Sequence, residues 1–346
     1  MNDAFRQRLE KIERALRHAF LTDTAVHALT DIEENVASER FDAKKNPFAL
    51  LSAPCAALLS SGGKRWRPLL TVLAYELAGG TDEAIYRLTP LIEGIHTASL
   101  IHDDIEDNSD MRRGKPAAHV VYGLDSALNA GSWLYFRSLK ALETYQAPAD
   151  IKLDLYAAAL SKIRALHEGQ ALDIHWHRTA GFFPPRQDYE RMIRLKTGAL
   201  ASLAAYTGMR AAGESAVKSE AFAALFAEAG VGFQIIDDVK NIGAGNAGKK
   251  RGDDIVEGKK SLPVILHIEK HPEDTAALTA YFERARREGI DSPAVEQAIA
   301  MLSGSISEAE EQGRAVVSSV AERLIVRYGS AAAEPFCLLF ELMQAL

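Results

Sequence analysis

Cysteine is nearly absent from this sequence, and other features that would define a class of protein are missing too. Two cysteines, Cys55 and Cys337, stand among 346 residues, both in apolar surroundings. They provide no disulfide framework, which excludes a small cross-linked secreted domain and favours a reducing compartment. No stretch is dominated by proline, serine or one sign of charge, so the sequence contains no evident linker.

Positive charge is also in short supply. Lys and Arg number 40 against 47 Asp and Glu, a formal net charge of −7, which argues against a nucleic-acid-binding protein. The longest uncharged run within a helical pattern, Thr197 to Met209, is too short to span a bilayer. The N-terminus lacks the apolar core of a signal peptide. We therefore expect a soluble, cytoplasmic protein with no stable membrane insertion.

Strand signals are almost missing, whereas helical periodicity runs through most of the chain. Long stretches of Ala, Leu and Ile recur at helical spacing, and 47% of the residues are hydrophobic, enough for a large core. The sequence predicts a single all-α domain over 1–346, a helical bundle built by facing apolar stripes. After a first helix near the N-terminus, we expect helices at 48–60, 68–78, 83–107, 119–143, 150–178, 188–212, 217–241, 261–270, 273–288, 292–327 and 331–344.

Four acids fall within five residues at 103–107, where one of these helices ends. Asp103 and Asp107 are four apart and share a helix face, so their like charges repel. Mg2+ offsets such repulsion, because it prefers carboxylate oxygens together with water and substrate phosphates. Arg112 and Arg113 follow a turn at 108–110 that would return them towards the carboxylates, and arginines grip phosphate oxygens in pairs. The plain alternative is a solvated helix end with surface arginines.

A second apolar helix ends in two adjacent acids, Asp237 and Asp238, with Asn241 four residues after the first. Burying acids at an apolar helix end is costly unless they are paired or bind a metal. Two such ends in one bundle indicate carboxylates that face each other across a cavity and hold several Mg2+ ions on a phosphorylated ligand. An ordinary helix C-terminus that emerges into water is the alternative.

Two basic loops fit such a ligand. Residues 62–68 place three cations on a glycine-opened turn just before a helix. Residues 249–251 lie in a glycine-rich loop, and Lys259-Lys260 follow Asp253-Asp254. No P-loop pattern is present. Each basic cluster alone suggests only a solvated surface, but the two together favour a pair of anionic ligands, one held through metal and one by cations.

In their order along the chain these motifs resemble the trans-isoprenyl diphosphate synthases. The similarity runs from Ser61 to Pro263, and six motifs in the family's order are highly specific. The segments 105–109, 129–136 and 170–176 look most like geranylgeranyl diphosphate synthases of the eukaryotic type. Asn241 stands where the family's second acidic motif usually ends in Asp, a change that the geranylgeranyl group often shows. The motifs are GKRWRP at 63–68, DDIED at 103–107 with RRG at 112–114, GQALD at 169–173, KTG at 196–198, FQIIDD at 233–238, and GDD at 252–254 followed by GK at 258–259.

The resemblance implies a role for each matching side chain within an isoprenoid synthase type of bundle around a central cavity. The metal ligands would be Asp103, Asp107 and Asp237, binding three Mg2+ ions, with Asp104 and Asp238 alongside. The allylic diphosphate would contact Arg112, Lys196 and Lys250, with Lys259 nearby. Isopentenyl diphosphate would contact Lys64, Arg67, His96 and Arg113, with Arg65 a weaker candidate. Gln170 and Asp173 would line the cleft, and Thr197 and Gln234 would lie beside the developing cation.

The reaction implied by the resemblance joins isopentenyl diphosphate to an allylic diphosphate (dimethylallyl, geranyl or farnesyl) by metal-assisted ionisation. Ala98 and Ser99, five and four residues before Asp103, are small where large aromatics in the family stop chain growth early. Geranylgeranyl diphosphate is therefore the expected product, and a homodimer the expected assembly.

Other functions stay open at this point. The product could be farnesyl diphosphate or a longer polyprenyl diphosphate. A class I terpene cyclase shares an aspartate-rich helix, but it would leave Lys64, Arg67 and Arg113 unexplained. A non-catalytic partner subunit would be favoured by lost acids, and here only Asn241 departs from the pattern.

Overall fold

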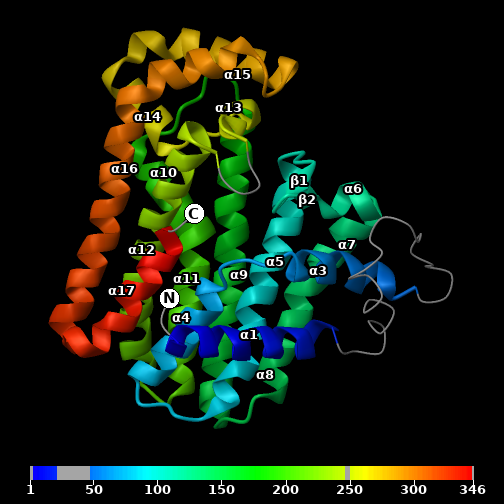
Figure 1. Cartoon of the computed structure of the whole chain (residues 1–346), viewed down its shortest axis with the longest axis vertical. Helices are drawn as coiled ribbons and strands as arrows, with labels where there is room; N and C mark the ends of the chain where they lie inside the picture. Colours follow the sequence, from blue (N-terminus) through cyan, green and yellow to red (C-terminus); the bar gives the residue numbers. More distant parts are fainter. Residues whose placement is uncertain (1–2, 22–46, 246–249, 345–346) are drawn as a thin grey trace. The chain divides into compact units, whose positions relative to one another are not determined.

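Helices make up nearly all of the regular structure, as the periodicity of the sequence predicts. The structure, a computed structural model, describes residues 3–21, 47–245 and 250–344 (Figure 1). Within these residues the only strands are β1 (Met111–Arg112) and β2 (Lys115–Pro116), which pair antiparallel. The all-α prediction is confirmed. Contacts divide the chain into two compact units, Met1–Ala159 with Ala204–Ser219 and Leu160–Leu203 with Glu220–Leu346. The single-domain interpretation stays a prediction.

The first unit is organised around α5 (Thr89–Glu106), the helix that ends in the first acidic motif. This helix contacts α7 (Leu124–Ser138), α4 (Trp66–Leu77) and α1 (Asp3–Leu21), and α3 (Ala49–Ser60) also contacts α7 (Figure 1). Glycine allows the α5–α7 approach, because a Cβ on Gly94 would stand 2.1 Å from Ser138 Oγ. The other elements of this unit are the 3-10 helix η2 (Glu83–Leu88), α6 (Ala118–Tyr122) and α8 (Lys140–Thr144).

The second unit is organised around the long helix α16 (Pro293–Tyr328). It contacts α14 (Leu262–Lys270), α15 (Thr275–Glu288) and α17 (Ser330–Gln344) (Figure 1). The remaining short elements here are α10 (Arg186–Ile193), the π-helix η3 (Arg194–Gly198), α13 (Asp253–Glu257) and the 3-10 helix η4 (Pro272–Asp274). Three helices belong partly to each unit by their residue ranges: α9 (Ala149–Arg178), α11 (Ala199–Ala211) and α12 (Ala216–Gly243).

The predicted helices are present, but three of them are divided. Residues 83–107 form η2 and then α5, with Pro90 in the first turn of α5, where a missing N–H costs nothing. Residues 119–143 are interrupted at Gly123, which has a φ of 88°. Residues 188–212 contain the π-helix η3 between two α-helices. Helix α13 was not predicted, because its five residues between Gly252 and Gly258 are too few for a periodic pattern.

Helix α12 is the one described helix that is long and apolar enough to cross a membrane by length and composition. Its most apolar window has a mean hydropathy of 1.2, and 61% of that window is buried. Phe222 and Phe226 are fully buried and pack against Phe336 on α17. Their ring centroids lie 5.7 and 5.6 Å from the centroid of the Phe336 ring. The core helix of a soluble protein has the same properties, so this is weak evidence for a membrane span.

Candidate active site

The first acidic motif occupies the last turn of α5 and is followed by a turn that returns the chain. Helix α5 ends at Glu106, and Asn108 then adopts a left-handed conformation with a φ of 53°. The hairpin β1–β2 turns at Arg113 and Gly114, whose positive φ values of 53° and 74° suit a two-residue turn of the primed type. The predicted return of the arginines towards the carboxylates is confirmed for Arg112.

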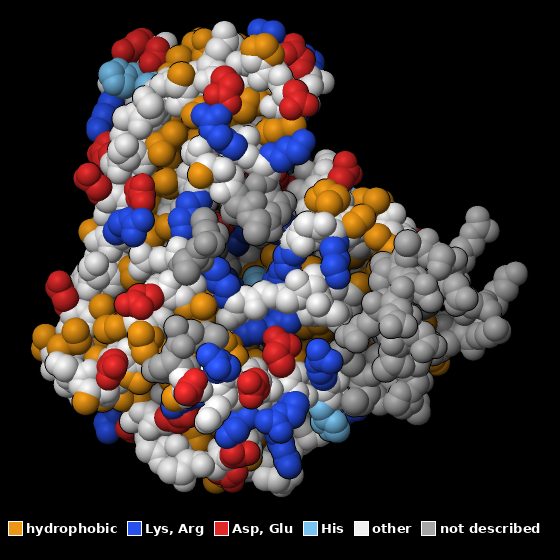
Figure 2. Space-filling view, viewed as in Figure 1, with side chains coloured by type: hydrophobic (Ala, Val, Ile, Leu, Met, Phe, Trp, Pro, Cys, Tyr) orange, Lys and Arg blue, Asp and Glu red, His pale blue; other side chains and the backbone are white. Residues whose placement is uncertain are grey.

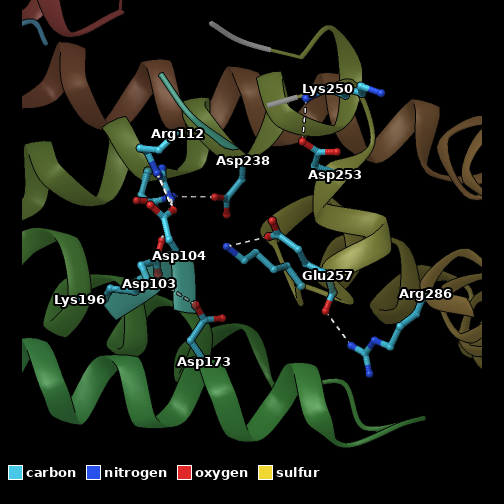
Figure 3. Close-up of polar contacts among 12 residues, drawn as sticks. Asp103, Asp104, Arg112, Asp173, Lys196, Asp238, Lys250, Asp253, Glu257 and Arg286 are labelled. Atoms are coloured by element: carbon cyan, nitrogen blue, oxygen red, sulfur yellow. Dashed lines mark hydrogen bonds and ion pairs between the residues drawn. The ribbon is translucent and has the colours of Figure 1, made fainter. Parts of the chain in front are cut away.

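Arg112 joins two of the carboxylates. Its Nε donates to Asp104 Oδ1 at 2.7 Å, and its Nη2 lies 3.5 Å from Asp103 Oδ2 (Figure 3). Asp104 is 1% exposed, and burial raises the pKa of its carboxyl although Arg112 opposes that shift. Its second oxygen, Oδ2, is buried without a hydrogen-bond partner among the described residues. Asp103 keeps 17% of its side chain exposed, so it is the more accessible of the two.

Arg113 points to a different element, the basic loop that begins at Gly62. Its guanidinium donates to the carbonyl of Gly62 and, at 3.4 Å, to that of Leu58. A Cβ on Gly63 would stand 3.0 Å from Arg113 Nη2, so glycine permits this approach. The hairpin therefore directs one arginine to the carboxylates and its neighbour to the loop that carries Lys64 and leads to Arg67.

Directly after that loop, in the first turn of α4, Arg67 lies beside His96 of α5. The Arg67 Nη1 atom is 3.4 Å from His96 Nε2, and the guanidinium stacks over the Trp66 ring at 4.2 Å. Burial lowers the pKa of His96 well below its ordinary value, and Arg67 and Arg113 act in the same direction. A neutral imidazole beside arginines is suited to an anionic ligand, because it offers a hydrogen bond without adding repulsion.

Arg65 is occupied by the protein itself. It is 5% exposed, and its guanidinium binds Glu93 at 2.7 Å, Glu13 at 2.7 Å and the carbonyl of Leu59 at 2.6 Å. Arg65 therefore fastens α1, α3 and α5 together, and a role for it as a diphosphate ligand is not supported by this arrangement.

In the second unit, Lys196 and Asp173 form an ion pair. Lys196 Nζ donates to Asp173 Oδ2 at 2.7 Å (Figure 3), and Asp173 is 6% exposed. Lys196 lies on the π-helix η3, which α9 approaches closely: a Cβ on Gly169 would stand 2.6 Å from the Lys196 backbone nitrogen. Gln170 follows Gly169 on α9 and is half-buried.

The second acidic motif also contains a buried carboxylate, that of Asp238 (8% exposed). Asp238 accepts hydrogen bonds from Gln234 Nε2 and from the Tyr189 hydroxyl, both at 2.8 Å, and Thr197 donates to Gln234 Oε1 at 2.6 Å. Burial, followed by the nearby Asp254, raises the pKa of Asp238 to about 7. Asp237 is half-buried, whereas Asn241 is 5% exposed.

Lys250 and the residues after it make several contacts with polar groups of the protein. The backbone nitrogen of Lys250 donates to Asp253 at 2.7 Å, and Lys259 pairs with Glu257 at 3.0 Å (Figure 3). Arg286 donates to the carbonyls of Glu257 and His177 at 2.6 and 2.7 Å. Lys249 lies outside the described residues.

The acidic side chains fit a cation that is shared with a ligand. Among the described residues, no group of three or more Asp, Glu, His or Cys side chains gathers as a metal cage. Mg2+ is commonly bound by one or two carboxylates plus substrate phosphates and retained waters. Asp103, with 17% of its side chain exposed, and the Asp104 oxygen that has no hydrogen-bond partner among the described residues provide carboxylate ligands of that kind.

Sequence reasoning missed several side chains that hold these groups. Tyr189, Glu93, Glu257 and Arg286 were not singled out, because each belongs to no motif. The one available signal was polarity at positions otherwise expected to be apolar, as for Glu93 on α5 (2% exposed) and Tyr189 on α10 (fully buried).

Comparison with known proteins identifies the class and then the family. The chain belongs to the polyprenyl synthetase family, whose pattern matches residues 48–302. It is 36% identical over 260 residues to a short chain isoprenyl diphosphate synthase of Methanocaldococcus jannaschii, covering 73% of this chain and 76% of the relative. It is 31% identical over 293 residues to a geranylgeranyl pyrophosphate synthase of Neocamarosporium betae, covering 82% of each chain.

Solved structures agree with this membership. A geranylgeranyl pyrophosphate synthetase from Pyrococcus horikoshii superposes with a TM-score of 0.81 at 26% identity, covering 99% of this chain and 97% of the other. A polyprenyl synthase from Caulobacter crescentus, complexed with calcium and isoprenyl diphosphate, gives a TM-score of 0.76 at 27% identity, covering 98% and 95%. The expected resemblance is confirmed: the chain is a prenyltransferase, a trans-prenyl diphosphate synthase.

Proposed function

We propose that this synthase condenses isopentenyl diphosphate with an allylic diphosphate, using Mg2+, and that its product is geranylgeranyl diphosphate. The observation that carries the proposal is the pairing of acids with cations in each unit, Asp103 and Asp104 with Arg112 and Asp173 with Lys196. Such pairs can exchange partners when a diphosphate and divalent cations arrive together, since the new charges satisfy both signs.

In this proposal Asp103, Asp107 and Asp237 hold the cations. The chemistry that Mg2+ supplies when bound is neutralisation of charge on the departing diphosphate. Arg112, Lys196, Lys250 and Lys259 would bind that diphosphate directly and hold it as the allylic C–O bond breaks with its electron pair.

The second diphosphate belongs to isopentenyl diphosphate, which would be held by Lys64, Arg67, Arg113 and the neutral His96. Its double bond attacks the allylic cation and forms the new carbon–carbon bond. A proton then leaves the new cation for the released diphosphate, so no nucleophilic side chain is needed. The side-chain oxygens of Thr197 and Gln234 would lie beside the allylic cation, and their dipoles would stabilise its charge.

The experiment that tests the function is incubation of the purified chain with labelled isopentenyl diphosphate, farnesyl diphosphate and Mg2+, followed by sizing of the product. Geranylgeranyl diphosphate is expected, and Asp103→Ala should abolish its formation with the thermal midpoint unchanged. A cyclised product without uptake of label would favour the cyclase alternative, and no turnover at all would favour a partner subunit.

Chain length is the finest part of the proposal. Ala98 is fully buried on α5, and Ser99 bonds through its hydroxyl to the His96 carbonyl at 2.8 Å, so neither presents bulk one turn before Asp103. Ala98→Phe should shorten the product to farnesyl diphosphate or geranyl diphosphate, because the added ring would occupy the space of the growing chain. An unchanged product spectrum from a folded variant would remove Ala98 as a determinant.

We also propose a homodimer, on the evidence of α7, and a cytoplasmic location, on the scarcity of cysteine. One face of this helix is core, with Ala127, Ala130 and Leu134 fully buried. The opposite stripe, together with α6, is apolar and exposed, and Figure 2 shows apolar side chains gathered at the surface over α6. A helix that is apolar on both sides needs a second cover, and an uncharged stripe suits an identical stripe related by twofold symmetry. The exposed residues are Val120 (51%), Val121 (51%), Leu124 (58%), Leu128 (51%) and Phe136 (72%).

A further inference from the structure

Four side chains from three elements of the second unit form one chain of hydrogen bonds. Tyr189 of α10 donates to Asp238 Oδ2 at 2.8 Å, and Gln234 Nε2 donates to Asp238 Oδ1 at 2.8 Å; Thr197 of η3 donates to Gln234 Oε1 at 2.6 Å. The two oxygens of Asp238 are thus each used by one donor. This carboxylate is engaged by protein groups on both sides, unlike the half-buried Asp237 beside it.

In this series of hydrogen bonds, the donors and acceptors fix how each side chain is oriented. A carboxylate accepts, so the NH2 group of Gln234 must face Asp238 and its carbonyl must face Thr197. The Thr197 proton is then committed to Gln234, which leaves the lone pairs of its oxygen directed elsewhere. If the Gln234 amide turned over, its oxygen would face a carboxylate and its NH2 would compete for the lone pairs of Thr197.

The fixed point of this chain is Tyr189. Its side chain is fully buried, and its ring belongs to a core cluster with Trp176, Ile193 and Ile235. The position of its hydroxyl is therefore set by packing of the core and does not depend on a ligand. Removing that hydroxyl would leave Asp238 Oδ2 buried without its donor, an arrangement that side-chain rotation would relieve.

We propose that Tyr189 is a positioning residue that orients Asp238, and through it the amide of Gln234, so that the Thr197 oxygen presents its lone pairs to the allylic cation. In this proposal Asp238 orients the Gln234 amide and does not bind metal. The inference rests on the proposed function, because it concerns how the Thr197 oxygen is oriented towards the allylic cation of that reaction. It gives a functional role to Tyr189, a residue that is not proposed to contact either diphosphate.

A double-mutant cycle tests the coupling. Tyr189→Phe keeps the packed ring and removes only the hydroxyl, and Thr197→Val removes the hydroxyl of the last member. Each single variant should lower kcat about tenfold with both KM values within about twofold, as expected for loss of one oriented polar contact. The double variant should be no slower than Thr197→Val alone, because the effect of Tyr189 passes through Thr197. The proposal would be overturned if the fold-loss of kcat in the double variant equalled the product of the losses in the two single variants.

A second variant and a control separate positioning from general destabilisation. Asp238→Leu removes both acceptor oxygens at a similar side-chain size, so it should give the same kcat loss if Tyr189→Phe does not fold. Tyr75→Phe is the matched control: Tyr75 is 7% exposed and its hydroxyl accepts from the Asp82 nitrogen at 3.3 Å, and it is far in sequence from Tyr189 and Thr197. It should leave kcat unchanged, and an equal loss there would count against a specific role.

A readout without turnover distinguishes failure of this inference from failure of the proposed function. The side-chain NH2 resonances of Gln234, assigned with a Gln234→Glu variant, should shift and exchange faster with solvent in Tyr189→Phe. They should be unaffected in Tyr75→Phe. Unchanged Gln234 resonances in Tyr189→Phe would overturn the positioning role even if condensation is observed, whereas absent condensation by the native chain would overturn the function alone.

Discussion

Arg65 and Arg67 lie two positions apart where the basic loop enters α4, yet their side chains have different partners. Arg65 is sealed between Glu93, Glu13 and a backbone carbonyl, with 3% of its side chain exposed. Arg67 is half-buried beside His96 and keeps a face over Trp66. The left-handed backbone at Arg65, with a φ of 50°, sends the two guanidinium groups to different places.

Substitution of Arg65 should therefore lower stability, whereas substitution of Arg67 should weaken substrate binding. Arg65→Met should lower the free energy of unfolding by about 3–5 kcal/mol, because it leaves the buried Glu93 without its partner. Arg67→Met should change stability by less than about 1 kcal/mol and raise KM for isopentenyl diphosphate at least tenfold, with a smaller change for the allylic substrate. Urea unfolding and steady-state kinetics on both variants would check this, and equal stabilities would contradict it.

His177, near the end of α9, should make the protein sensitive to acid. Burial lowers its pKa to about 4; Lys259, Arg286 and Lys196 act in the same direction, and Asp173 opposes them. The unfolded side chain titrates near ~6.5. Between these values the unfolded state binds more protons, so the free energy of unfolding must fall as pH falls from 6.5 to 4.

The measurement is the difference in unfolding free energy between the native chain and His177→Gln as a function of pH. The native chain should lose about 2–4 kcal/mol more than the variant on going from pH 7 to pH 4. His175→Gln is the matched control, because His175 is exposed on the same helix. Parallel pH curves for the native chain and His177→Gln would contradict the assignment.

At the scale of elements, the π-helix η3 depends on close approach to two helices. It presents Lys196 and Thr197, and α9 reaches it through Gly169. On its other side, a Cβ on Gly198 would stand 2.8 Å from the Ala227 carbonyl of α12. Gly169 on α9 and Gly198 at the end of η3 thus permit the close packing of a segment that carries two of the proposed site residues.

Gly169→Ala should displace that segment. The added Cβ would meet the Lys196 nitrogen at 2.6 Å and Leu195 Cβ at 2.9 Å, so backbone must move. We expect a loss of about 1–3 kcal/mol in stability and at least tenfold in kcat. Gly304→Ala is the control, because Gly304 is exposed on α16 with nothing within 4 Å; it should stabilise by up to about 1 kcal/mol with activity intact. Equal effects of the two changes would contradict the close-approach argument.

At the scale of the whole molecule, the exposed stripe of α7 sets the expected assembly. Leu128→Glu should convert the dimer to a monomer, because it would bury two like charges in a twofold interface. Val326→Glu is the control, since Val326 is 87% exposed on α16 and far from that stripe in sequence. Sedimentation velocity would check both, and a native chain that sediments as a monomer would remove the dimer from the proposal.

The sequence by itself determined the class of fold and the chemistry of the motifs. Helical spacing of apolar residues sets which face of a segment must be buried, and that is a local property. The turn after Asp107 could be expected for the same reason, because Asn108 and Gly114 tolerate the left-handed backbone that returns Arg112 to the carboxylates.

Only the tertiary structure decided which of several similar side chains are fully buried and which keep some exposed surface for a ligand. Nothing local separates Arg65 from Arg67, or Asp103 from Asp104, because their difference lies in partners such as Glu93 that come from distant helices. The role of Tyr189 was equally hidden, since its hydroxyl meets Asp238 across 49 positions of sequence. Burial and hydrogen-bond partners are set by packing of elements, and a periodic pattern does not carry that information.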